Sequence, residues 1–148
     1  MPIHFFLYGI FGWCAEIVWT AAGAAVAALT TGRRIDARLM GHTYLWMFPI
    51  YGGGGLLFEL AHRIVAAWPW PARGLAYMLG CFTVEYGSGW LINRVAGRIP
   101  WDYSYKRWHV HGLIRLDYAP VWFVFGMILE RVEVAVRAAG PVLRAVLR

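Results

Sequence analysis

Four long apolar stretches dominate the sequence and leave few folds open to it. They cover roughly residues 3–29, 45–67, 73–95 and 117–138. Each has the length of about 20 mainly apolar residues that a helix needs to cross a bilayer. A helix that spans a membrane satisfies its backbone polar groups internally, whereas an open strand does not. We therefore expect an all-α membrane fold, a bundle of four transmembrane helices that forms one integral membrane domain over residues 1–148.

The composition agrees with a membrane protein. Hydrophobic residues make up 60% of the chain and charged residues 15%, against about 25% charged residues in soluble domains. The net charge of +6 fits basic loops facing anionic lipid headgroups, so we expect membrane lipids as partners and no nucleic acid. The start has no basic n-region, and we expect the first stretch to be a retained helix. Cys14 and Cys81 lie in apolar stretches and are expected to be small packing residues.

The two halves of the chain resemble one another. Residues 49–59 and 120–130 share a proline, an aliphatic residue, an aromatic residue, a glycine four positions before a glutamate, and three large apolar residues. The first and third stretches match more weakly, through Tyr8, Gly12 and Glu16 against Tyr77, Cys81 and Glu85. We interpret this as a duplicated helical hairpin whose copies are related by a pseudo-two-fold axis along the membrane normal. The alternative is chance likeness between apolar helices, and superposition of the two halves tests it.

Each apolar stretch carries one glutamate near its centre, in order Glu16, Glu59, Glu85 and Glu130. An ionised carboxylate at the bilayer centre costs about 3 kcal/mol, so all four should face the bundle interior and have partners. Small residues at helical spacing beside them are typical of a helix–helix face. We expect at least one pair of carboxyl groups to meet across the repeat. Nearby cations are His62, Arg63, Arg94 and Arg131.

The glutamates, together with Arg94 and His62, thus form a candidate ligand- or proton-binding core. The alternative is that they are only hydrogen-bonding links between helices. Glu59 and His62 form a Glu-x-x-His, a motif that di-iron bundle sites use twice. Glu133 stands where a second histidine would be, so we expect no metal and no cofactor. The run of glycines at 52–55 predicts either a broken helix at a ligand site or simple close packing.

The longest connection, residues 96–116, is rich in tryptophan and tyrosine. We expect its segment Trp101, Asp102, Tyr103 and Ser104 to fold back to the membrane surface, where such aromatic residues commonly lie. Asp102 either organises a turn, as aspartate and serine often do, or pairs with a cation such as Arg94, Arg98 or Lys106. His109 and His111 are expected to be solvated or to contact headgroups.

Several blocks of the sequence resemble a known family. They are Gly-Trp-Cys-Ala-Glu at 12–16, Pro-Ile-Tyr-Gly at 49–52, Glu-Tyr-Gly-Ser-Gly at 85–89, Trp-Asp-Tyr-Ser at 101–104 and Gly-Leu-Ile at 112–114. Over roughly residues 5–133 the chain resembles the bacterial type IV ABC-transporter permeases, and through 100–104 and 113–119 the vertebrate transmembrane protein 229 family. The resemblance implies a permease-like protein of the bacterial inner membrane. The four glutamates and Arg94 fall on its blocks, whereas His62 does not match its pattern.

Three functions remain open on these grounds. The carboxylate-lined core favours a protein that binds or translocates a small molecule, ion or lipid without catalysis. A membrane-embedded enzyme acting on a lipid would use a glutamate, Asp102, His109 or His111 as acid or base, but no nucleophile constellation supports it, and we assign no catalytic residue. A structural or assembly subunit is the third. The sequence has no Walker motif, so an ABC role would need a partner protein, and a homo-oligomer is also open.

Overall fold

The structure, a computed structural model, describes residues 2–98 and 101–146, and nearly all of its regular structure is helical. The helices are α1 (Pro2–Thr30), α2 (Met47–Val65), α3 (Trp70–Ala96) and α4 (Ala119–Val146). Before α4 lie two short strands, β1 (His109–Val110) and β2 (Ile114–Arg115), and the 3-10 helix η1 (Leu116–Tyr118). The prediction of a helical fold with four long helices is confirmed, while the small antiparallel hairpin of β1 and β2 was not expected.

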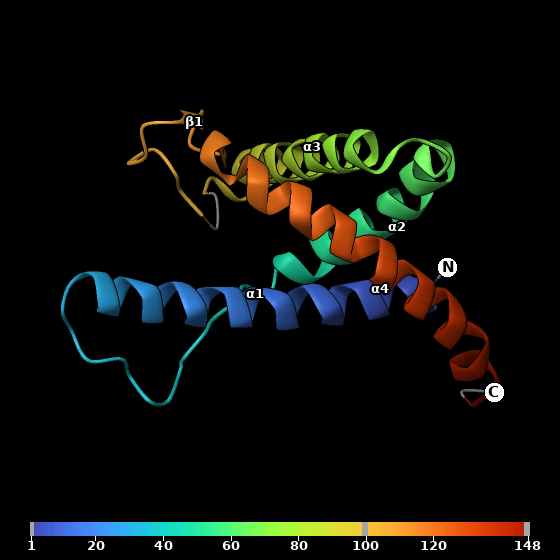
Figure 1. Ribbon diagram of the computed structural model, residues 1–148, viewed down its shortest axis with the longest axis horizontal. Coiled ribbons are helices and arrows are strands. Elements are labelled where there is room, and N and C mark those ends of the chain that lie inside the picture. Colours follow the sequence, from blue (N-terminus) through green and yellow to red (C-terminus); the bar gives the residue numbers. More distant parts are fainter. Residues whose placement is uncertain (1, 99–100, 147–148) are drawn as a thin grey trace.

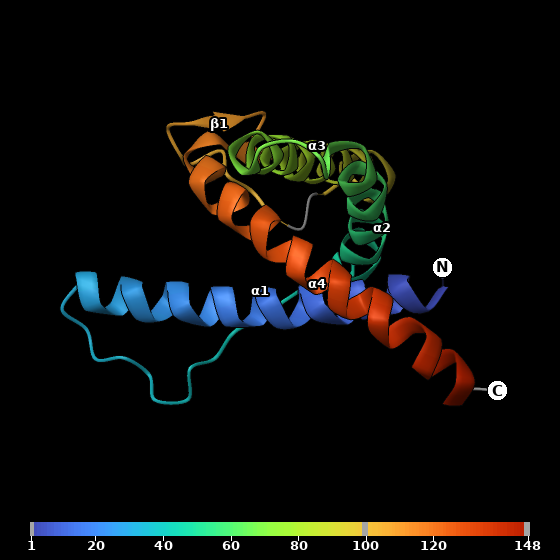
Figure 2. The same cartoon turned by 45° about the vertical axis from the view of Figure 1, so that its right-hand side comes forward.

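The helices pack mainly in chain order. Helix α1 packs most extensively on α2, and α3 on α4. Figures 1 and 2 show α1 and α3 on opposite sides of the molecule, with α2 leading from one to the other and α4 crossing diagonally. Both termini lie at the same end (Figure 1). Two successive helical hairpins are the arrangement that a duplicated unit would give, and the superposition of the halves stays a prediction.

Glycines allow the helices of each pair to approach closely. A Cβ atom on Gly55 of α2 would overlap the ring of Tyr8 on α1, and one on Gly126 of α4 would overlap Tyr77 on α3 in the same way. Helix α2 is continuous through residues 52–55, so the expectation of a broken helix is wrong. Tight packing of the aromatic rings, which only a residue without a side chain permits, explains the glycines at 52 and 55.

Proline and glycine set the ends of α3. Pro69 precedes the helix, and Pro71 stands in its first turn, where the missing N–H of proline costs no helical hydrogen bond. Gly97 ends the helix with a φ of 69°, and its N–H returns to the carbonyl oxygen of Asn93 at 2.9 Å. A left-handed glycine of this kind is a common helix terminator, and the expected end of the third stretch at residue 95 was nearly correct.

Helix α4 continues to Val146, well beyond the end at residue 138 that the sequence suggested, and it passes through Pro141. A proline inside a helix removes one backbone hydrogen bond. Gly140 is buried here against the imidazole of His4, and a Cβ atom at Gly140 would lie only 2.7 Å from His4 Nε2. The additional turns of α4 therefore pack against the start of α1. A hydropathy pattern does not reveal such a contact.

Of the described helices, α1 alone passes a test of length and apolar composition for crossing a membrane, with a mean hydropathy of 1.5 over its best 18 residues. Charged residues near the middle of α2, α3 and α4 lower the hydropathy of those helices. Hydropathy and length alone therefore support one membrane span and not the four expected from the sequence.

The connection between α1 and α2 returns along α1 instead of projecting away. Thr20 Oγ1 donates to the carbonyl oxygen of His42 at 3.0 Å and accepts from the His42 N–H at 2.9 Å. The indole N–H of Trp13 donates to the carbonyl oxygen of Tyr44 at 3.1 Å. These bonds bring the end of the loop back beside the middle of α1, where Glu16 lies.

Candidate functional site

A polar network around Glu130 joins three helices. Arg73, in the first turn of α3, donates from Nε to Glu130 Oε1 at 2.6 Å and from Nη2 to Oε2 at 3.2 Å. The hydroxyl of Tyr77, one turn further on, donates to the same Oε1 at 2.8 Å. His62 of α2 lies with its Nδ1 2.6 Å from the Tyr77 oxygen. Since the tyrosine gives its only proton to the carboxylate, His62 Nδ1 is the donor in that contact.

The equivalent position in the first half is organised in the same way. His4 Nδ1 lies 2.7 Å from Glu59 Oε1, and the phenol of Tyr8 lies beside the same carboxyl group. His4 and Tyr8 are four residues apart on α1, as Arg73 and Tyr77 are on α3, so each pair shares a helix face. In both halves, a basic residue of the first helix binds the glutamate of the second helix, and a tyrosine one turn later on the first helix lies beside that glutamate.

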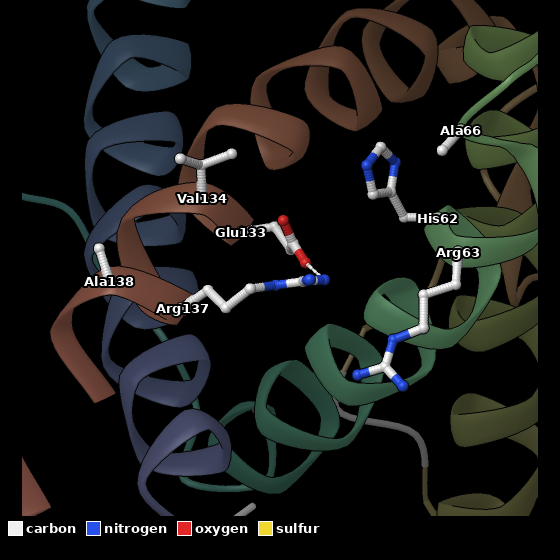
Figure 3. Close-up of a pocket in the computed structure, with 7 residues that line it drawn as sticks. All are labelled: His62, Arg63, Ala66, Glu133, Val134, Arg137 and Ala138. Carbon is white, nitrogen blue, oxygen red and sulfur yellow. Dashed lines mark hydrogen bonds and ion pairs between the residues drawn. The ribbon is translucent and has the colours of Figure 1, made fainter. Parts of the chain in front are cut away.

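Glu133 is the most buried charged side chain of the described residues, with 3% of its surface exposed. Arg137, one turn later on α4, donates to its carboxyl group. Figure 3 shows this pair facing His62 and Arg63 of α2 across an open groove of about 510 Å³. The sequence analysis used Glu133 only to argue against a metal site. Its position three residues after Glu130, on the same helix face, was the signal that could have identified it.

Glu16 and Glu85 lie at the other end of the polar interior. The hydroxyl of Thr43, from the loop that returns along α1, donates to Glu16, and the phenol of Tyr51 lies beside the same group. Glu85 Oε1 accepts a hydrogen bond of 3.1 Å from the hydroxyl of Tyr103, which reaches it from the long connection before α4. Loop residues therefore complete the surroundings of both carboxyl groups.

A cavity of about 340 Å³ lies among all four helices. Most of its lining is apolar, including Phe11, Phe58, Cys81 and Phe125, and the glycines Gly54 and Gly55 form part of its wall. Of the four predicted glutamates, Glu85 is the one that lines it, with Trp101 and Trp122 also contributing. The interior thus combines ion-paired polar clusters with one mainly apolar chamber that has a single carboxyl group in its wall.

The structure places Arg94 outside the predicted core. Arg94 is exposed on the last turn of α3, with its guanidinium carbon 6.0 Å from the centre of the Trp90 ring. It follows Glu85 by nine residues, which is two and a half helical turns, so the two side chains leave opposite faces of α3. The bases that contact glutamates are His4, His62, Arg73 and Arg137.

The expected direct contact between carboxyl groups is replaced by contacts with other side chains. Each predicted glutamate is held by a histidine, arginine, threonine or tyrosine. Across the halves, His62 bonds to Tyr77 and lies 3.9 Å from Glu130 Oε1. Glu59 is buried, and the other three glutamates are partly exposed. Their shared role as a ligand or proton site stays a prediction.

The segment 101–104 folds back onto the bundle. The indole N–H of Trp101 donates to the carbonyl oxygen of Leu113 at 2.9 Å, and Tyr103 reaches Glu85. Asp102 accepts from the Ser104 N–H at 2.8 Å and from its hydroxyl at 3.0 Å, which lowers the pKa of the Asp102 carboxyl group. Asp102 therefore organises a turn, the first of its two expected roles. Pro100 lies outside the described residues.

We expect Asp102→Asn to leave the melting temperature in detergent nearly unchanged at neutral pH, because the amide oxygen still accepts from the Ser104 N–H. Asp102→Ala should lower it. Because the folded pKa of Asp102 is depressed, a smaller contribution from its charge is present above the ordinary carboxyl pKa of about 4 and is lost as the pH falls below it, and Asp102→Asn should lack this pH dependence. Thermal unfolding from pH 7 to pH 3 measures both effects. An asparagine variant as unstable as the alanine variant would show that the charge matters instead.

The histidines of the hairpin make local contacts. His109 Nδ1 accepts from the Gly112 N–H at 2.9 Å, and His111 Nδ1 lies 2.9 Å from the hydroxyl of Tyr86. Within residues 2–98 and 101–146, no three histidine, cysteine, aspartate or glutamate side chains gather in an arrangement suited to a metal ion. Cys14 and Cys81 are both free thiols. These contacts give no specific support to an acid–base pair at the hairpin.

Comparison with known proteins gives one family. The family described as "Putative ABC-transporter type IV" matches residues 3–142, a range that includes nearly all of the four helices and the connections between them. No solved structure matches the chain.

Proposed function

Since the chain belongs to this family of type IV ABC-transporter proteins, we propose that it is a four-span membrane protein that binds a lipid or another small apolar molecule in its central cavity, as a permease would. Of the predicted core residues, Glu85 contacts the ligand in this proposal. Glu59 and Glu130, each paired with a base, hold the helices together.

The outer surface supports four spans. Every long helix carries large apolar side chains that are more than half exposed, for example Val18 on α1 (68%), Ile64 on α2 (75%), Leu79 on α3 (60%) and Val124 on α4 (57%). A soluble monomer rarely exposes apolar surface on this scale, whereas lipid tails would cover it in a bilayer. The charged residues that lower the hydropathy of α3 and α4 include the pair Arg73–Glu130, and intramembrane charges ordinarily face inward and pair in this way.

The single observation that carries the binding proposal is the cavity of about 340 Å³ with its apolar wall. Protein interiors are packed with few voids larger than a water molecule. An apolar cavity of about 150 Å³ already stays dry and binds small apolar molecules. A chamber about twice that size, among helices with lipid-like outer faces, is therefore suited to an apolar guest.

We expect Ala76→Leu, which adds a larger side chain to the cavity wall, to reduce the amount of copurified lipid by about tenfold, because overfilling an occupied space costs 1–3 kcal/mol. The matched control is Ala22→Leu, at an exposed position on α1. Native mass spectrometry and lipid extraction of protein purified in mild detergent measure the retained lipid. If both variants retain as much lipid as the wild type while staying folded, the cavity is not the binding site.

A further inference from the structure

We infer that the cavity selects a lipid alcohol, a molecule with an apolar body whose hydroxyl group binds between Glu85 and Trp122. This rests on the proposed function, because it names the ligand class for the same cavity. It adds a polar recognition site that shape and hydrophobicity alone do not provide.

Unpartnered polar atoms gather around this cavity. Among the described residues, four buried side-chain atoms have no hydrogen-bond partner, namely His4 Nε2, Tyr8 Oη, Glu85 Oε2 and Trp122 Nε1. Tyr8, Glu85 and Trp122 all line the cavity. Buried polar groups in proteins nearly always have a partner, so the orphans at Glu85 and Trp122 indicate an occupant that supplies the missing bonds.

The two atoms at Glu85 and Trp122 define what that occupant must offer. Glu85 uses Oε1 to accept from Tyr103, so its free Oε2 needs a donor. The indole of Trp122 lies within reach of the same carboxyl group without a hydrogen bond of ordinary geometry between them, so a group placed between the two can accept from its N–H. A hydroxyl group is a donor and an acceptor at once. An ammonium group only donates, whereas an ether, an ionised phosphate or a carboxylate only accepts.

The rest of the cavity requires an apolar body. Its volume of about 340 Å³ is roughly ten times the volume of one molecule in liquid water. Its wall is mainly apolar. Leu57 of α2 and Gly80 and Thr83 of α3 line the cavity and are also exposed, so the chamber reaches the outer surface of the bundle beside α2 and α3. In a four-span protein, a lipid could enter there directly from the bilayer.

Four probes of equal chain length test this inference: decanol, decyl methyl ether, decylamine and decane. Binding to delipidated protein in detergent is measured by calorimetry. We expect decanol to bind about tenfold more tightly than the ether, because the ether cannot donate to Glu85 and a buried acceptor left without a donor costs about that factor. Glu85→Gln should abolish this preference, since its amide N–H donates to an ether oxygen. The control Ser88→Ala should keep it, because the Ser88 hydroxyl, also on the cavity wall, is bonded to the carbonyl oxygen of Val84.

The outcomes separate this inference from the proposed function. If decanol and its ether bind equally to the wild type, the alcohol site is wrong, while binding of either probe still supports an apolar guest. Tightest binding of decylamine overturns the alcohol in favour of a cation. If no probe binds, the proposed function fails as well. Should Glu85→Gln not fold, Trp122→Phe is the second test, and it should weaken decanol and the ether alike by removing the shared donor.

Discussion

Gly55→Ala is expected to destabilise the protein by about 3 kcal/mol, whereas Gly53→Ala, two residues earlier in the same glycine run, should leave it as stable or more stable. A Cβ atom at Gly55 would overlap the Cβ atom and the first ring atom of Tyr8, and these atoms move only with the backbone of α1. Overpacking of such a site costs up to about 3 kcal/mol. No atom lies within 4 Å of a Cβ at Gly53, and alanine favours a helix over glycine by about 1 kcal/mol.

Thermal unfolding in detergent, followed by circular dichroism, measures both variants. Gly126→Ala provides an independent repeat in the second half, since its Cβ atom would overlap Tyr77. Equal melting temperatures for Gly53→Ala and Gly55→Ala would show that α1 and α2 do not pack through these glycines.

Arg73→Met should lower the melting temperature in detergent markedly, because it leaves the Glu130 carboxylate without the base that donates to both of its oxygens. Both side chains are largely enclosed, with 21% of Arg73 and 13% of Glu130 exposed. Removing one partner of an enclosed pair is far more harmful than removing both. We therefore expect Arg73→Met combined with Glu130→Gln to regain most of the lost stability, since Tyr77 can still donate to the amide oxygen.

The matched control for this prediction is Arg63→Met, which removes an arginine from the wall of the open groove near the end of α2. Exposed substitutions of this kind usually change the stability by less than about 0.5 kcal/mol. The comparison uses the same unfolding measurement in detergent. Equal losses in Arg63→Met and Arg73→Met, or no recovery in the double variant, would contradict the role given to the Arg73–Glu130 pair.

The sequence located the four helices well because the signals for a long helix are local. Apolar runs of sufficient length lie between segments rich in proline, glycine and charged residues. Pro69 stands at the start of α3 and Gly97 at its end, and the backbone preferences of these two residues set its bounds. The main error was the end of α4, which the sequence placed at residue 138. The helix continues through Pro141, where Gly140 packs against His4, although local preference would end a helix there.

The candidate site was predicted only in part, for the same reason. Helical spacing placed Glu59 beside Gly55 and Glu130 beside Gly126, and the structure has these residues on packed faces. The turn role of Asp102 was one of two expected because aspartate followed two residues later by serine commonly forms such bonds. Arg94 was misplaced because its depth along α3 was considered without its angle around the helix axis.

The sequence by itself determined that four helices form, that each carries at least one glutamate near its middle, and that small residues accompany these glutamates. Composition and a period of 3.6 residues are properties of short segments. Only the tertiary structure decided which base holds which carboxyl group. His4 meets Glu59 from 55 residues away, and Arg73 meets Glu130 from 57. The cavity, its unpartnered Glu85 oxygen and the return of Tyr103 to that glutamate likewise depend on how remote segments approach one another. Such approaches are set by the packing of whole helices, and no local pattern in the chain encodes them.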